Sequence, residues 1–425
     1  MRYILKGGDV VGRQVVKKDI LIDHGVIELI DDNIDDEDAT VIDCEGYTIA
    51  PGFIDMHVHL REPGFEYKET IKTGTQAAAR GGFTTICPMP NTNPVMDSFE
   101  KVQAFMKKVE TDAVVNVLPF AAITKELKEN QELVDMKSLK KMVAGFSNDG
   151  LGLQKASLMY RAMQRANEIE ALISAHCEDE SLLFGGFVHR GIKSQQNEWE
   201  SMTALPESIQ VARDVLISEE TDARYHVCHI STKESIRIVR EAKKRGVKVT
   251  SEVTPHHLLL VNRDVENENF KMNPPLRNVD DKYALIQALL DGTIDCVATD
   301  HAPHAESEKK RGMKEAPFGV VGLETAFPLI YTNLVRTNMA TLTQAIQWFS
   351  INPAKILNLD LGYIVKNRQA DLTILDLNRK QTINKNTFYS KGKNTPFDGW
   401  EAYGFPVMTF VRGKVVYHDE TFNRR

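Results

Sequence analysis

The sequence is poor in cysteine, and the cysteines it has are scattered. Its 425 residues include only five, none of them in a CxxC pair: Cys44, Cys87, Cys177, Cys228 and Cys296. An odd number of widely spaced cysteines argues against a disulfide framework and against a zinc site built from cysteine. This usage is typical of a reducing compartment, and we expect a cytoplasmic protein.

Two further kinds of segment are missing. There is no basic run, and 59 acidic against 52 basic residues give a formal net charge of −7, so nucleic acid is not an expected partner. No apolar run approaches the length that spans a bilayer, and the first residues, MRYILKGGDVVG, lack the features of a secretory signal. We therefore expect no membrane association.

The middle of the chain alternates between short β-rich runs and longer segments with helical periodicity. Eight strand candidates stand at 53–60, 83–91, 114–123, 142–149, 172–179, 224–231, 248–257 and 295–304. Segments such as 153–170 and 232–246 lie between them and carry the helical pattern. Eight such units favour a (β/α)₈ TIM-type barrel over an open doubly wound sheet, and we place it at residues 52–357.

Both ends of the chain are rich in short β patterns broken by glycine. Because the termini of a barrel lie near each other, residues 1–51 and 358–425 are predicted to form one small, β-sandwich-like satellite domain. The polar stretch HAESEKKRGMKEAP, residues 304–317, is predicted to be a long exposed loop. It is either a lid or plain solvated surface.

Alternate residues of a barrel strand face inward, so side chains at its mouth should share parity with the inward positions before them. Counting along the strands predicts these inward series: Phe53, Asp55, His57, His59 and Arg61; Thr85, Cys87, Met89 and Asn91; Val143, Gly145, Ser147 and Asp149; Leu172, Ser174 and His176; Tyr225, Val227 and His229; Cys296, Ala298 and Asp300. Residues of opposite parity, such as His226 and His301, should point toward the helices.

Several of these series end in a potential metal ligand. Together they supply nitrogen and oxygen donors of the kind that zinc accepts: His57, His59, Asp149, His176, His229 and Asp300. The number of donors suggests two ions with a bridging carboxylate at Asp149. Asp300 is predicted to bind metal and to act as a general acid and base. The alternative for Asp300 is a carboxylate that only orients His57 or His59.

Nine motifs occur in one order along the chain: PGFIDMHVHLREPG, CPMPNTNP, GFSNDG, SAHCED, CHIST, VTPHHL, MNPPLR, ATDHAPH and PFGVVGLE. In these motifs the chain closely resembles the bacterial type I dihydroorotases of the amidohydrolase superfamily, from residue 45 to residue 410. Many members of that superfamily bridge their metals with a carboxylated lysine. Here the matching strand offers Asp149, which agrees with the dihydroorotase branch.

The resemblance implies a zinc enzyme that interconverts N-carbamoyl-L-aspartate and L-dihydroorotate in pyrimidine synthesis, with a metal-bridged hydroxide as nucleophile. The metal positions of the family fall on the six residues above, with one or two zinc ions. Its substrate positions fall on Arg61, Asn91, Asn273 and His304 and on the backbone of Phe318 and Gly319. A homodimer is implied, and association with aspartate transcarbamoylase is a further expectation.

The chemistry of Arg61 supports the same substrate. A cyclic ureide with a free carboxylate needs a cation that grips two oxygens, and a planar guanidinium does so better than lysine. The alternative for Arg61 is a surface ion pair with Glu62 or Glu66. Two other functions compete: another cyclic amidohydrolase (hydantoinase, dihydropyrimidinase or allantoinase), or a catalytically silent scaffold for aspartate transcarbamoylase. The former substrates lack the ring carboxylate, and such scaffolds lose metal ligands.

Overall fold

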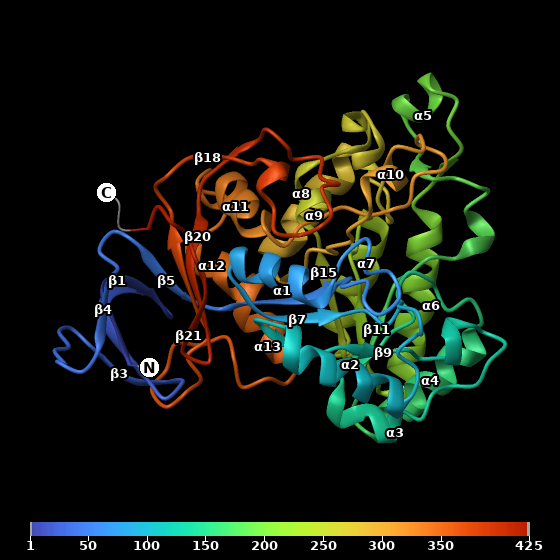
Figure 1. Ribbon diagram of the computed structural model, residues 1–425. Coiled ribbons are helices and arrows are strands. Elements are labelled where there is room, and N and C mark those ends of the chain that lie inside the picture. The colour runs from blue at the N-terminus through green and yellow to red at the C-terminus, as the bar shows by residue number, and fades with distance from the viewer. Residues whose placement is uncertain (1, 423–425) are drawn as a thin grey trace.

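Eight parallel strands in the middle of the chain surround a common interior. In this computed structural model, which describes residues 2–422, Figure 1 shows these strands enclosed by helices. The strands are β6 (Phe53–Val58), β7 (Phe83–Pro88), β8 (Asn116–Val117) with β9 (Phe120–Ala121), β10 (Gly145–Phe146), β11 (Leu172–Ala175), β14 (Arg224–Val227), β15 (Val249–Val253) and β16 (Cys296–Val297).

Hydrogen bonds close these strands into a barrel. One sheet runs β6-β7-β8 and another β9-β10-β11-β14-β15-β16. β8 and β9 belong to one strand that is interrupted at Pro119, which has no amide hydrogen to donate. At the other seam the His59 amide donates to the His301 carbonyl oxygen at 2.8 Å, beside a parallel bridge between Val58 and His301. The predicted eight-stranded barrel is confirmed.

Helices cover the outside of the barrel. They are α1 (Ile71–Arg80), α2 (Phe99–Asp112), α3 (Met136–Leu139), α4 (Ala156–Glu168), α6 (Leu205–Thr221), α7 (Lys233–Lys244), α9 (Val279–Leu290), α11 (Ala326–Ile330), α12 (Leu342–Ile346) and α13 (Asn352–Ile356). Helix α7 illustrates how they form. It begins after Thr232, whose hydroxyl accepts from the Ser235 amide, and buries Ile236 and Val239 against the strands. Short helices α5 (Ile192–Gln196), α8 (Pro255–Leu259) and α10 (Glu306–Lys309) lie in the longer connections.

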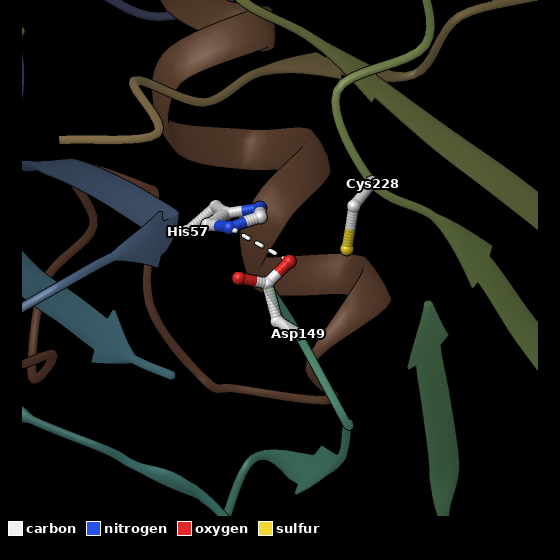
Figure 2. Close-up of side chains that lie close together, drawn as sticks. All are labelled: His57, Asp149 and Cys228. Carbon is white, nitrogen blue, oxygen red and sulfur yellow. Dashed lines mark ion pairs between the residues drawn. The ribbon is translucent and has the colours of Figure 1, made fainter. Parts of the chain in front are cut away.

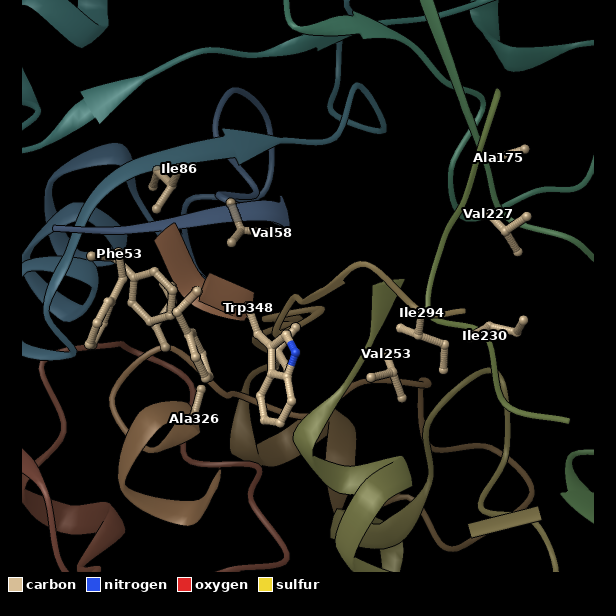
Figure 3. Close-up of a cluster of buried hydrophobic side chains, with 14 of the residues drawn as sticks. Phe53, Val58, Ile86, Ala175, Val227, Ile230, Val253, Ile294, Ala326 and Trp348 are labelled. Atoms are coloured by element: carbon tan, nitrogen blue, oxygen red, sulfur yellow. The ribbon is translucent and has the colours of Figure 1, made fainter. Parts of the chain in front are cut away.

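The main hydrophobic core lies between the strands and the helices. Figure 3 shows part of it, with Phe53 of β6, Val227 of β14 and Val253 of β15 in the same cluster as Ala326 and Trp348 from the helical layer. A separate cluster fills the barrel interior: Ile54, Met56, Cys87, Met89, Phe120, Leu172, Cys228 and Cys296. Burial of apolar side chains in both clusters stabilises the fold, by about 25 cal/mol for each Å² of apolar surface removed from water.

The predicted alternation holds on some strands, is wrong on β6 and β14, and is wrong at Val143 before β10, which packs in the outer core. Cys87, Leu172 and Cys296 face inward as predicted. On β6, however, Ile54 and Met56 fill the interior, and Phe53 packs against the helices. A register shift between Asp55 and Val58 then breaks the alternation, so the histidines of this strand still reach the mouth.

The sixth strand departs in the same way. Tyr225 faces outward, where its hydroxyl donates to Asp214 of α6 at 3.3 Å. His226 points inward and its Nε2 lies 3.2 Å from Glu252, contrary to the prediction. His229 nevertheless points into the barrel mouth, because its φ of 30° interrupts the extended strand and turns the side chain. His301 does face away from the interior, toward Glu69 at 3.4 Å.

Strands from both ends of the chain form one sheet beside the barrel, drawn in blue and red at the left of Figure 1. Its order is β21-β20-β17-β5-β1-β2-β3, with β4 paired to β1. The N-terminal strands are β1 (Tyr3–Val11), β2 (Val15–Asp23), β3 (Val26–Asp31), β4 (Thr40–Asp43) and β5 (Thr48–Pro51). The C-terminal strands are β17 (Leu372–Asp376), β20 (Phe405–Val411) and β21 (Lys414–His418). The antiparallel β5–β17 pair joins the two ends, and the satellite boundaries at 51 and 358 stay a prediction.

Two short ladders complete the fold: β12 (Val188–His189) with β13 (Ser201–Met202), and β18 (Gln381–Thr382) with β19 (Glu401–Ala402). The segment between β18 and β19 reaches the barrel mouth, where the Ser390 hydroxyl donates to Glu69 and the Asn394 amide donates to the Ala302 carbonyl oxygen. In residues 2–422, no helix combines the length and the apolar character that a membrane crossing requires.

Candidate metal and substrate site

Six polar side chains converge at the carboxyl ends of the barrel strands. They come from the ends of five strands: His57 and His59 from β6, Asp149 from β10, His176 from β11, His229 from β14 and Asp300 from β16. All six are buried. In (β/α)₈ barrels this end carries the chemistry, because all parallel strands deliver their last residues there. The sequence predicted each of these positions.

The six donors form two groups with Asp149 between them. In the first, the Oδ1 atom of Asp300 lies 3.1 Å from His59 Nε2 and 3.5 Å from His57 Nε2. In the second, His176 Nδ1 lies 3.0 Å from His229 Nε2. Asp149 Oδ1 lies 3.3 Å from His57 Nε2 and 3.7 Å from His229 Nε2, so one carboxylate faces both groups.

These distances fit a divalent cation. A tetrahedral ion with bonds of about 2.0–2.1 Å separates its ligand atoms by about 3.3 Å, close to the spacing found here. Within residues 2–422, His57 Nε2 and Asp149 Oδ1 are buried and have no hydrogen-bond partner. Buried polar atoms left unpaired are costly unless something else satisfies them. The donor set therefore indicates a metal cofactor.

The electrostatics of the site favour added positive charge. Burial alone would raise the pKa of Asp149, yet the surrounding histidines, His57 foremost, hold it well below its usual value. Burial likewise opposes ionisation of Asp300, but the hydrogen bond with His59 and the nearby histidines lower its pKa. Both carboxyl groups are thus ionised at neutral pH and are available as ligands.

Cys228 lies against this site and was not predicted there. Figure 2 shows its sulfur near the Asp149 carboxylate and the His57 ring. Burial raises the pKa of the Cys228 thiol to about 12, and its sulfur lies 3.0 Å from the Ser174 hydroxyl. The thiol is therefore protonated and closes the floor of the site as a small apolar group. Its inward position was missed because the alternation on β14 was predicted one residue out of phase.

A cavity of about 280 Å³ opens above the metal ligands. It is lined by His59, Arg61, Asn91, Asp149, Gly150, His176, His229, Asn273, Asp300, Ala302, His304, Pro317, Phe318 and Gly319. Every predicted substrate position is in this set. His57 is fully buried and lies outside it. The sequence did not single out Gly150, Ala302 or Pro317, which carry no reactive group.

Arg61 reaches the cavity without a carboxylate partner in the described chain. Its Nε donates to the Pro303 carbonyl oxygen at 3.1 Å. The two acids considered as partners are engaged elsewhere: Glu62 pairs with Lys108 at 2.8 Å, and Glu66 accepts from the Gly64 amide at 2.9 Å. Burial lowers the pKa of Arg61 to about 10, so it stays charged at neutral pH. The ion-pair alternative is therefore wrong in this structure.

His304 is neutral and has one definite tautomer. Burial, together with Arg61 and Lys68, lowers its pKa to about 2. Its Nε2 donates to the Phe318 carbonyl oxygen at 2.8 Å, so Nδ1 is the acceptor for Lys68 Nζ at 3.3 Å. Next to Phe318, Gly319 has φ 148°, and a Cβ there would meet the Ala302 carbonyl oxygen at 2.6 Å. Only glycine allows this close backbone approach.

The two asparagines are oriented by neighbours in the site. The Asn91 side-chain oxygen lies 3.0 Å from His59 Nδ1, and this contact holds the ring with its Nε2 toward Asp300 in the first donor group. Asn273 donates its amide hydrogens to Glu178 at 3.1 Å, and its Oδ1 has no partner within residues 2–422. The sequence did not predict a role for Glu178, because nothing in the SAHCED motif separates this acid from a surface carboxylate.

The 304–317 segment is tied to the site. It contains helix α10, and the ammonium of Lys309 is buried and donates to the carbonyl oxygens of Lys271 at 3.2 Å, Pro317 at 3.0 Å and Gly319 at 3.3 Å. Pro317 and Gly319 line the cavity. The segment therefore supports one wall of the site and is not plain solvated surface.

Solved structures share this fold. They include the dihydropyrimidinase of Brevibacillus agri (TM-score 0.88, 24% identity, covering 100% of this chain and 96% of that one) and the D-hydantoinase of a Thermus species (TM-score 0.86, 28% identity, 99% and 96%). Fold and donor groups together define a metal-dependent hydrolase barrel of the amidohydrolase type.

Curated relatives show which family of this class the chain belongs to. A dihydroorotase of Listeria innocua serovar 6a is 52% identical over 98% of this chain and 99% of its own length, and one of Bacillus cytotoxicus is 50% identical over 99% of both. The model of the family described as dihydro-orotase-like matches residues 46–235. The chain belongs to the dihydroorotase family.

Proposed function

We propose that this protein is a dihydroorotase, which interconverts N-carbamoyl-L-aspartate and L-dihydroorotate plus water in pyrimidine biosynthesis. Its relatives at about half identity over nearly their full length carry that name. The observation in the site that carries the proposal is Arg61, a charged guanidinium beside the metal groups with no carboxylate partner in the described chain. A substrate carboxylate would complete it.

We further propose zinc as the metal, with two ions as the favoured number. His57, His59 and Asp300 would hold one, His176 and His229 the other, and Asp149 would bridge them. One ion remains the alternative, because ligand count alone carries the second. When bound, such ions lower the pKa of water to near 7 and polarise a carbonyl group.

Asp300 is proposed to move the proton. During ring opening its carboxylate accepts a proton from the attacking water and delivers it to the ring nitrogen that leaves. During ring closure it removes a proton from the carbamoyl nitrogen, which then attacks the side-chain carboxylate with loss of water. The low pKa of Asp300 keeps it ionised and ready to accept, and its Oδ1 already faces His59.

The other cavity residues are proposed to hold the substrate. Arg61 would grip the ring carboxylate, assisted by Asn91 and the neutral His304. The free Oδ1 of Asn273 would accept from a ring N–H, and Phe318 and Gly319, which line the cavity, would place their backbone beside the ureide. Held in this way, the carbonyl carbon would face the two ligand groups.

The competing functions fit less well. Structural neighbours are hydantoinases and dihydropyrimidinases, and an allantoinase would share their fold. A charged Arg61 facing an uncharged ring would keep its desolvation cost without an ion partner. A silent scaffold is disfavoured by the complete set of six donors at mutually suitable distances. The homodimer and association with aspartate transcarbamoylase are proposed from family resemblance alone, and the cytoplasmic location from the few, scattered cysteines.

The test is ring opening of L-dihydroorotate by purified protein, followed by the loss of its ultraviolet absorbance. Protein loaded with zinc should turn over dihydroorotate, and protein stripped by a chelator should not until zinc is restored. Hydantoin, dihydrouracil and allantoin serve as comparison substrates. Faster turnover of one of these than of dihydroorotate would contradict the proposal, as would no turnover of any by zinc-loaded protein.

A further inference from the structure

A buried glutamate lies directly beneath the proposed metal site. Glu252 stands on β15 with no exposed surface, and its register partner on the next strand is Cys296 of the barrel interior. The acid stands in the middle of KVTSEVTPHH, where no motif marks it. An ionised side chain in such a place is costly unless every oxygen is hydrogen-bonded.

Both oxygens of Glu252 are fully engaged. Its Oε1 lies 2.7 Å from His57 Nδ1 and accepts from the His229 amide at 3.3 Å. Its Oε2 lies 3.2 Å from His226 Nε2, and His226 Nδ1 lies 2.8 Å from the Thr250 hydroxyl. One carboxylate thus connects three strands, β6, β14 and β15.

These contacts determine which nitrogen of His57 is free. Glu252 Oε1 already accepts from the His229 amide and lies 2.7 Å from His57 Nδ1, so it acts as the acceptor in both contacts. His57 must then carry a hydrogen on Nδ1. Its Nε2 then faces the ligand cluster, 3.3 Å from Asp149 Oδ1, where it would bind a metal. Figure 2 shows the His57 ring facing that carboxylate.

The same carboxylate holds the backbone of a second ligand. His229 has φ 30°, a conformation that a non-glycine residue adopts only when its surroundings impose it. The His229 amide donates to Glu252 Oε1 at this bend, where the chain leaves β14 and turns the His229 side chain into the mouth. Glu252 therefore contacts one proposed ligand of each metal group.

A metal site at Glu252 itself is a weaker interpretation. Glu252, His226 and Cys296 lie close enough to share an ion. However, both nitrogens of His226 and both oxygens of Glu252 already have hydrogen-bond partners. Burial raises the pKa of the Cys296 thiol well above its ordinary value, so it offers no thiolate. The cluster is a hydrogen-bonded support.

We infer that Glu252 is a positioning residue for metal binding, which fixes the Nδ1-protonated form of His57 and the bent backbone at His229. The inference rests on the proposed metal site. Carboxylates that orient a metal-bound histidine typically account for 10–100-fold in metal affinity. His226 is the anchor that keeps the carboxylate in place.

The test measures zinc affinity of chelator-stripped protein by competition with a chromophoric chelator. Glu252→Gln keeps the shape and removes the charge, and Glu252→Asp keeps the charge and withdraws it from His57. Each should bind zinc about 10–100-fold more weakly than wild type, and the visible spectrum of the cobalt-loaded form should change. Asp214→Asn, a buried carboxylate that contacts Arg213 and Tyr225 behind the strand, is the matched control and should bind zinc normally.

The outcomes separate the inference from the function. Wild-type zinc affinity in either folded Glu252 variant overturns the positioning role and leaves the proposed function intact. If the Gln variant does not fold, the Asp variant decides by the same criterion. Wild-type protein that binds no zinc overturns the proposed function, and the inference falls with it.

Discussion

Asp300 has two assigned tasks, and one substitution addresses both. Asp300→Asn keeps an oxygen that can face the metal but removes the carboxylate that takes up a proton. Turnover of dihydroorotate should fall by about 10²–10⁴-fold, with a small change in KM. Zinc content is measured in the same sample. Asp280→Asn, at an exposed ion pair with Lys233, is the control. A variant with more than about a tenth of wild-type turnover would be inconsistent with proton transfer by Asp300.

Arg61 distinguishes a substrate that carries a carboxylate from one that does not. Arg61→Lys retains the charge but loses the planar pair of donors, so KM for dihydroorotate should rise by about 10–100-fold, as the loss of a charge-assisted hydrogen bond implies. The comparison is the same variant acting on dihydrouracil, if that ring is opened at all. Equal changes for both rings would show that Arg61 does not hold the carboxylate.

At the level of single residues, the sequence predicted which polar groups converge at the mouth and missed those that support them. The ligands and Arg61 stand at strand ends in recognisable motifs. Glu252, Glu178 and Lys309 depend on partners distant in the sequence, such as the carbonyl oxygen of Lys271 for Lys309. No local pattern shows which buried acid faces a ligand, so their contacts could be found only from the fold.

At the level of elements, α10 and the segment after it form a wall of the cavity. Lys309→Met removes three hydrogen bonds to carbonyl oxygens. We expect KM for dihydroorotate to rise about tenfold, because small displacements of substrate-positioning groups are costly, and hydrogen exchange at residues 304–319 to become faster. Lys310→Met, which removes an exposed ion pair with Glu306, is the matched control. Unchanged KM and exchange in the Lys309 variant would show that the segment needs no such support.

Strand parity shows how far a simple periodic rule extends. The rule is correct on β7, β11 and β16, where the residues predicted to face inward lie in the interior cluster. It failed on β6 and β14, where the register shift after Asp55 and the bent backbone at His229 change which residues face inward. Arg61 and Asp300 also have positive φ, at 63° and 47°. Such irregularities concentrate at the site, and they depend on tertiary contacts that sequence alone does not contain.

For the whole molecule, the satellite sheet and the barrel depend on each other. A chain ending at residue 357 would lose β17, β20 and β21, leaving β5 paired with β1 alone, and would lose Asn394 at the mouth. We expect this truncated chain to show no cooperative thermal transition and no turnover. A truncated protein with a wild-type transition and turnover would show that residues 1–357 fold and act without the C-terminal strands.

An anomalous-scattering map of zinc-loaded crystals, recorded at the zinc edge, would locate and count the ions of the metal centre. We expect two peaks at the barrel mouth, one among His57, His59 and Asp300 and one among His176 and His229, with Asp149 in contact with both. A map with no peak among these six side chains, or with its zinc bound elsewhere on the molecule, would contradict this expectation.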